Sequence, residues 1–192
     1  MSKQIYVNMR QSRVGENILG PHTRYCLWVS GCNRRCPGCI SPESHDMQAG
    51  TPIPAGALAW EVILSDVEGI TISGGEPFLQ AEALCEFLRH IKRHRDVGVI
   101  VYTGYVLEEL SDVAGAKELI ELCDLIIDGP YIQQLDDGKA LRGSSNQRVI
   151  PVTQRYAAYL DLYGSGTRQV QTPSALAPQM QYAGIPTNST YF

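Results

Sequence analysis

The sequence lacks the features that mark several classes of protein. Lys and Arg number 16 against 20 Asp and Glu, so the excess positive charge of a typical nucleic-acid-binding protein is missing. Charged residues break every longer apolar stretch, which excludes a membrane span of 18 residues. The first residues also lack the apolar segment of a secretory signal peptide. We therefore expect a cytoplasmic protein that binds neither nucleic acid nor membranes.

Charge is nearly absent from the last part of the chain. Between residues 162 and 192 the single charged side chain is Arg168, and prolines interrupt any regular element. The length of 192 residues suits one domain, since roughly 100–200 residues per domain is usual. We expect residues 1–161 to form that domain and residues 162–192 to form an irregular extension.

What the sequence does have is a dense group of cysteines. Three of its six cysteines fall within eight residues, as Cys32-x3-Cys36-x2-Cys39. This spacing indicates a metal or cluster site. A structural zinc site would need a second, separate pair of ligands, and the sequence offers none. Three thiolates on a four-iron cluster leave one iron open, as in a catalytic metal site, so we favour a cluster over structural zinc or a redox-active thiol loop.

Short apolar runs alternate with helical patterns, which predicts βα repeats and a mostly parallel sheet. The predicted strands cover residues 24–29, 69–73, 97–102, 125–128 and 148–152. The predicted helices cover residues 81–95 and 107–123, although Gly115 weakens the second. The remaining cysteines, Cys26, Cys85 and Cys123, lie in apolar patterns and are predicted to pack in the core. Functional groups are expected at the carboxyl ends of the parallel strands.

A second motif follows the strand at 69–73. Ser73, Gly74, Gly75 and Glu76 form a turn in which two glycines allow the backbone to approach a ligand closely. Glu76 adds a carboxylate that suits a ligand ammonium group. Taken alone, such a turn is more often a tight connection. One βα unit after the cysteine loop, it indicates a binding site.

These motifs resemble those of the radical S-adenosylmethionine (SAM) enzymes. The match is closest to the activating proteins of anaerobic (class III) ribonucleotide reductase and related glycyl-radical activases. The cysteine and Gly-Gly-Glu-Pro motifs point to the superfamily. The segments TGY at 103–105, DGPY at 128–131 and RGSSNQR at 142–148 narrow it to this subgroup. Together they cover about residues 14–152.

The resemblance implies an α/β fold, a partial (β/α) barrel of mostly parallel strands that holds one [4Fe–4S] cluster and SAM. Cys32, Cys36 and Cys39 would bind three irons, and the amino and carboxylate groups of SAM would bind the fourth. The implied cofactor-binding residues are Ser73, Gly74, Gly75, Glu76, Thr103, Asp128, Asn146 and Arg148. For Asn146 and Arg148, a role in bracing the last strand stays open.

The resemblance also implies a reaction. A flavodoxin- or ferredoxin-type donor would reduce the cluster, and SAM would be cleaved to methionine and a 5′-deoxyadenosyl radical. That radical would abstract a hydrogen atom from the Cα of one glycine in a partner such as anaerobic ribonucleotide reductase. The cofactor supplies the chemistry, while the protein positions it and excludes water and oxygen. A small open barrel suits a substrate loop delivered from outside.

Two other functions stay open. One is radical SAM chemistry on a peptide or a small metabolite, and the other is a non-catalytic zinc or electron-transfer module. The sequence also departs from the family at three places. His22 stands where family members usually have glycine, and it is expected to alter access to the site. Gly38 stands where many radical SAM enzymes have an aromatic residue, although the reductase-activase subgroup has this glycine. The extension over residues 162–192 has no counterpart in the short activases and could cover the open side of the barrel.

Overall fold

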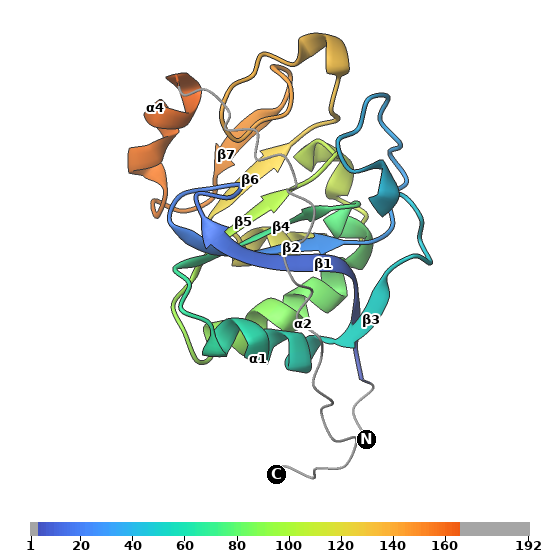
Figure 1. Ribbon diagram of the computed structural model, residues 1–192, viewed down its shortest axis with the longest axis vertical. Helices are drawn as coiled ribbons and strands as arrows, with labels where there is room; N and C mark the ends of the chain where they lie inside the picture. The colour runs from blue at the N-terminus through green and yellow to red at the C-terminus, as the bar shows by residue number, and fades with distance from the viewer. Residues whose placement is uncertain (1–3, 166–192) are drawn as a thin grey trace.

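The computed structural model describes residues 4–165, which form one mixed sheet with helices on both faces (Figure 1). The seven strands lie in the order β3-β1-β2-β4-β5-β6-β7. They are β1 (Tyr6–Glu16), β2 (Thr23–Val29), β3 (Thr51–Pro54), β4 (Gly69–Gly74), β5 (Gly98–Tyr102), β6 (Leu125–Asp128) and β7 (Arg148–Pro151). The neighbours β2, β4, β5 and β6 are parallel, whereas β1, β3 and β7 pair antiparallel with their neighbours.

The sheet confirms the α/β class and the parallel centre but is not closed into a barrel. Its two edges are β3 and β7, which lie at opposite ends of the strand order. All five predicted strands are present, as β2, β4, β5, β6 and β7. The sequence missed β1 and β3. In β1 only Val7 and Met9 are buried. The alternation of apolar and polar residues that marks a strand therefore ends after Met9.

The helices are α1 (Ala55–Leu64), α2 (Ala81–Lys92), α3 (Ala116–Leu122) and α4 (Ala157–Ser165). Short 3₁₀-helices, η1 (Pro42–Ser44), η2 (Pro77–Gln80), η3 (Leu107–Leu110) and η4 (Gln133–Leu135), lie in the connections. The single helix predicted over 107–123 is wrong, because η3 and α3 are separate. Gly115 divides them: its φ of 77° is left-handed, and a Cβ there would lie 2.9 Å from the backbone nitrogen of Glu82.

Each face of the sheet has its own apolar cluster. Residues alternate along β5, with Val99 and Val101 in the main core and Ile100 in the smaller cluster on the other face. Tyr156, directly before α4, belongs to that smaller cluster, while α1, α2 and α3 pack on the main core (Figure 1). The thiols predicted to pack inside are buried in the structure: Cys26, Cys85 and Cys123.

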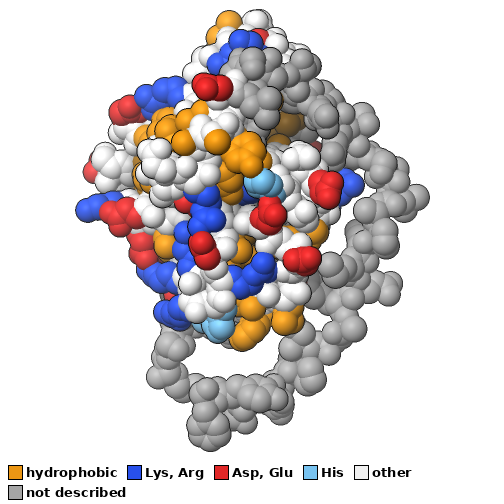
Figure 2. All heavy atoms as spheres, turned by 90° about the vertical axis from the view of Figure 1, so that its left-hand side faces the viewer, with side chains coloured by type: hydrophobic (Ala, Val, Ile, Leu, Met, Phe, Trp, Pro, Cys, Tyr) orange, Lys and Arg blue, Asp and Glu red, His pale blue; other side chains and the backbone are white. Residues whose placement is uncertain are grey.

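The surface carries both signs of charge. On the face shown in Figure 2, acidic and basic side chains are intermingled. Within residues 4–165 no helix is long and apolar enough to cross a membrane.

The last helix, α4, crosses the predicted boundary at residue 161, so residues 162–165 are helical. The rest of the predicted extension, and its expected cover over the open side, lies outside the described residues.

Candidate active site at the carboxyl ends of the parallel strands

Four chemistry-bearing segments meet at one edge of the sheet. The cysteine loop follows β2, the Gly-Gly-Glu-Pro turn follows β4, the TGY segment follows β5 and the DGPY segment follows β6. These strands are consecutive neighbours and run parallel. Their carboxyl ends therefore lie side by side, which is where open α/β sheets bind ligands.

The cysteine loop carries three free, half-buried thiols: Cys32, Cys36 and Cys39. The backbone N–H of Ser41 donates to Cys39 Sγ at 3.4 Å. Burial raises the pKa of the Cys39 thiol, the Ser41 N–H opposes that shift, and the neighbouring thiols add to it. A bound metal favours the deprotonated thiolate.

The donor set of this loop fits an iron–sulfur cluster, because closely grouped thiolates are the usual ligands of iron–sulfur clusters and of zinc. Among residues 4–165 no three His, Cys, Asp or Glu side chains are assembled as for a single metal ion. A cluster makes no such demand, since each cysteine binds a different iron atom.

The two glycines of the turn after β4 allow it to pack against the base of the cysteine loop. Gly74 has φ of +99°, and a Cβ there would lie 2.6 Å from the carbonyl oxygen of Val29. A Cβ on Gly75 would lie 2.2 Å from the carbonyl oxygen of Gly31. The N–H of Gly75 donates to Val29 and that of Glu76 to Gly31, both at 2.8 Å. Backbone contact with the cysteine loop thus requires these glycines, whatever the turn binds.

Glu76 ties the ends of two strands together. It is 1% exposed, and its Oε1 accepts from the N–H of Phe78 at 3.0 Å and from Thr103 Oγ1 at 2.8 Å. Its Oε2 accepts from the N–H of Gly104 at 2.8 Å. Burial raises the pKa of Glu76, and these three donors oppose that shift. Both oxygens of the carboxylate predicted to meet a ligand therefore already bind the protein.

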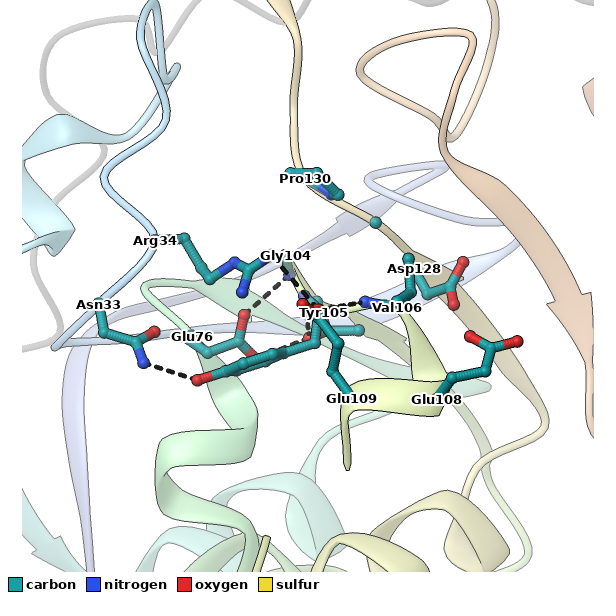
Figure 3. Close-up of polar contacts among 12 residues, drawn as sticks. Asn33, Arg34, Glu76, Gly104, Tyr105, Val106, Glu108, Glu109, Asp128 and Pro130 are labelled. Atoms are coloured by element: carbon teal, nitrogen blue, oxygen red, sulfur yellow. Dashed lines mark hydrogen bonds and ion pairs between the residues drawn. The ribbon is translucent and has the colours of Figure 1, made fainter. Parts of the chain in front are cut away.

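A contact that the sequence did not predict joins the cysteine loop to the segment after β5 (Figure 3). Asn33 Nδ2 donates to the hydroxyl of Tyr105 at 2.6 Å. The guanidinium carbon of Arg34 lies 4.6 Å from the centroid of the Tyr105 ring. Arg34 also pairs with Glu109 of η3 at 3.3 Å. The sequence signal was present, since Asn33 and Arg34 lie between two cysteines and Tyr105 belongs to the TGY motif.

Asp128 and Arg148, both predicted to bind the cofactor, contact each other. Asp128 is fully buried at the end of β6, where its Oδ1 accepts from Arg148 Nε at 2.9 Å and its Oδ2 accepts from the N–H of Leu107 at 2.9 Å. Arg148 also donates to both carboxylate oxygens of Glu108, which lowers the pKa of Glu108 to about 2. This arrangement favours the bracing role that the sequence left open for Arg148.

The segment around Asn146 holds the DGPY loop. Asn146 Nδ2 donates to the carbonyl of Pro130 at 2.8 Å, and Gln147 Nε2 donates to that of Gly129 at 2.8 Å. Asn146 Oδ1 is buried and has no hydrogen-bond partner in the described part of the chain. A buried amide oxygen without a donor is unfavourable, so it is suited to accept a hydrogen bond from a ligand.

His22 does not lie near this site, contrary to the sequence expectation. It precedes β2, and its imidazole contacts Glu68 at 2.9 Å and the hydroxyl of Tyr159 at 2.7 Å. Glu68 precedes β4, so both residues lie at the amino edge of the parallel strands. The cysteine loop begins at the other end of β2, roughly 20 Å away at about 3.3 Å per residue.

Comparisons with known proteins find a matching family model and similar proteins. The model of the family described as "4Fe-4S single cluster domain" matches residues 18–150. The chain is 34% identical over 154 residues to the anaerobic ribonucleoside-triphosphate reductase-activating protein of Escherichia coli K12, covering 74% of this chain and 97% of that protein. The proteins of the same name from Haemophilus influenzae and Enterobacteria phage T4 are 36% and 31% identical, over 69% of this chain and 90% and 86% of their own lengths.

Proposed function

The chain belongs to the family of anaerobic ribonucleoside-triphosphate reductase-activating proteins, and we propose that it installs the glycyl radical on an anaerobic ribonucleotide reductase. The observation that carries this proposal is the docking of the Gly-Gly-Glu-Pro turn on the base of the cysteine loop. The N–H of Glu76 donates to Gly31, next to Cys32, at 2.8 Å. A cluster bound by this loop and a ligand bound by this turn would be neighbours.

In this proposal Cys32, Cys36 and Cys39 hold one [4Fe–4S] cluster, and the turn Ser73 to Glu76 holds the amino group of SAM. Thr103 fixes the turn through Glu76, and the unpartnered Oδ1 of Asn146 accepts a hydrogen bond from SAM. When bound, the cluster and SAM supply a carbon-centred radical that abstracts hydrogen from the Cα of a glycine.

The other residues keep the frame in place. Asp128 and Arg148 join β6, β7 and η3, so the loops above these strands keep their spacing. The sheet is open, and we infer that it works as the incomplete barrel of the radical SAM enzymes, with its open side facing the substrate. A glycine in a protein loop has to enter from outside, which an open sheet permits.

Two further parts of the proposal concern the surroundings. The single electron has to come from a low-potential carrier, and we infer a flavodoxin- or ferredoxin-type protein. All six cysteines are free thiols, which suits the reducing cytoplasm. We infer that the protein works there, with no role for nucleic acid or a membrane.

The test is an anaerobic reconstitution with iron and sulfide, followed by reduction with dithionite and addition of SAM. We expect about four irons per chain, as a single cluster requires, and formation of 5′-deoxyadenosine. With anaerobic ribonucleotide reductase added, electron paramagnetic resonance (EPR) should show a glycyl radical on that partner. Deoxyadenosine without a glycyl radical would indicate another substrate, and zinc without SAM cleavage would refute the proposal.

A further inference from the structure

We propose that Arg34 and Tyr105 form a clamp that holds the cysteine loop in the shape that receives the cluster. Both would be positioning residues, acting on the cluster through the loop. The inference rests on the proposed function, because the clamp has this role only if the three cysteines bind a cluster. Figure 3 shows Asn33 and Arg34 reaching from the loop toward the ring of Tyr105.

The cysteine loop has little regular structure of its own. Between β2 and η1, residues 30–41 form neither helix nor strand. Backbone hydrogen bonds fix its base, from Gly31 to Ser44 at 2.9 Å, from Cys32 to His45 at 3.2 Å and from Glu76 to Gly31 at 2.8 Å. Side-chain contacts are therefore needed to fix the stretch between Cys32 and Cys36.

The clamp supplies such contacts from both residues that follow Cys32. The amide of Asn33 donates to the Tyr105 hydroxyl at 2.6 Å, and the guanidinium of Arg34 lies over the ring. The ion pair of Arg34 with Glu109 adds a second anchor on η3. A planar guanidinium suits this position, because it can stack on an aromatic face and bind a carboxylate at once.

The other side of the clamp is fixed to the sheet. The N–H of Tyr105 donates to Thr103 Oγ1 at 3.1 Å, and its carbonyl accepts from the N–H of Gly129 at 2.7 Å. Thr103 Oγ1 in turn donates to the buried carboxylate of Glu76. The backbone of Tyr105 is thus fixed to the ends of β4, β5 and β6.

The consequence is a common frame for the loop and the turn. A cluster has fixed distances between its irons, so the cysteines must be held at matching distances. Contacts around metal ligands raise affinity by holding the ligands in place, and their loss typically lowers metal affinity about 10- to 100-fold. Because the clamp and the Gly-Gly-Glu-Pro turn share Thr103 and Glu76, the same contacts would also set the loop relative to bound SAM.

The chain offers a matched control within the same loop. Arg35 follows Arg34 directly, is exposed, and forms no ion pair within residues 4–165. Arg34→Gln and Arg35→Gln remove the same charge one residue apart. Tyr105→Phe removes only the hydroxyl, while Tyr105→Ala removes the ring as well. Arg34→Lys keeps the charge but not the planar group.

The experiment reconstitutes each full-length variant without oxygen and measures bound iron and sulfide. It then follows loss of the cluster absorbance after addition of bipyridyl, an iron chelator. We expect Arg34→Gln and Tyr105→Ala to lose the cluster about tenfold faster than the unaltered protein. Arg34→Lys and Tyr105→Phe should be intermediate and Arg35→Gln unchanged. The EPR change that SAM causes in the reduced cluster should shrink in the same order.

The outcomes are distinguishable. If Arg34→Gln and Arg35→Gln lose the cluster at equal rates, the clamp is refuted while the proposed function stands. If the unaltered protein binds no iron and sulfide, the proposed function fails and the clamp fails with it. Thermal unfolding of each chain before reconstitution serves as the folding control. Should Tyr105→Ala fail to fold, Tyr105→Phe and Arg34→Lys decide, and rates equal to that of the unaltered protein would refute the clamp.

Discussion

The two edges of the parallel strands are built in opposite ways. At the carboxyl edge, the three thiols of the cysteine loop are free and half-buried, although the nearby carboxylates of Glu76 and Asp128 are buried and bonded to the protein. At the amino edge, the charged side chain of Arg24 is completely buried. The carboxyl edge therefore carries free thiols, whereas the charged group at the amino edge forms all of its hydrogen bonds within the protein.

Arg24 shows how the amino edge is closed. Its Nε donates to Thr71 Oγ1 at 2.6 Å and its Nη1 to the Tyr156 hydroxyl at 2.8 Å. Further bonds go to the carbonyl oxygens of Pro21, Ile70 and Gly98. No carboxylate pairs with it within residues 4–165, so the charge is satisfied by carbonyl and hydroxyl dipoles and by the Tyr156 ring, whose centroid lies 5.4 Å from the guanidinium carbon. It joins β2, β4, β5 and the residue before α4, which stabilises the fold at the end away from the chemistry.

The comparison separates stability from activity. In barrels and open α/β sheets, residues at the carboxyl ends of strands serve the reaction and those at the amino ends serve the fold. Substitutions at the carboxyl edge should therefore remove function without unfolding the chain. Substitutions at the amino edge should do the reverse.

The largest effect is expected from Cys36→Ala. Loss of one of three ligands should abolish both the cluster absorbance and SAM cleavage, with the thermal unfolding of the metal-free chain little changed. Cys85→Ala, in the main core, should keep both the cluster absorbance and SAM cleavage. Loss of the cluster in Cys85→Ala instead would show that the ligands are wrongly assigned.

Arg24→Met should act in the opposite way. It removes the donor of five buried hydrogen bonds, so we expect the free energy of unfolding to fall by about 3 kcal/mol. Urea unfolding of the metal-free chain measures this change. Arg13→Met, at an exposed arginine of β1, is the control. Equal stability of the two variants would mean that the amino edge does not depend on Arg24.

A smaller effect is expected of Cys26→Ala on the way the free energy of unfolding depends on pH. Burial raises the pKa of its thiol from 9.0 to about 12, so above pH 9 the unfolded chain releases a proton that the folded chain keeps. The resulting contribution to stability is complete below pH 9 and declines as the pH rises toward 12. Between about pH 8 and pH 10, Cys26→Ala should lose about 1 kcal/mol less than the unaltered chain in urea unfolding. Equal losses would contradict the buried position of this thiol.

The smallest effect is expected from His22→Gly. Glycine relieves the left-handed φ of 66° but removes the contacts with Glu68 and Tyr159, which are partly exposed. The relief of backbone strain and the loss of these contacts oppose each other, so the free energy of unfolding should change by less than about 1 kcal/mol. SAM cleavage should be unchanged, because His22 lies at the amino edge. A clear change in SAM cleavage would restore the expectation that His22 controls access to the site.

The sequence predicted the parts of the fold whose signals are local. The central strands are short apolar runs, and α2 has a clear amphipathic pattern over Ala81–Lys92. It missed α1, which has no side-chain cap and no charged first turn, and it missed the division between η3 and α3. Two side chains that it assigned to ligand binding, Glu76 and Arg148, also hold strand ends together. A sequence shows that a carboxylate lies near a site but not which donors already occupy it.

The sequence by itself determined the chemistry of this protein and the edge of the sheet where it occurs. The cysteines lie within one loop, the second motif follows the next parallel strand, and both facts are readable from short stretches of chain. Only the tertiary structure decided what holds these stretches in place. Asn33 meets Tyr105 across 72 residues, and Arg24 meets Tyr156 across 132. Contacts over such separations depend on strand order and helix packing, which no local pattern specifies.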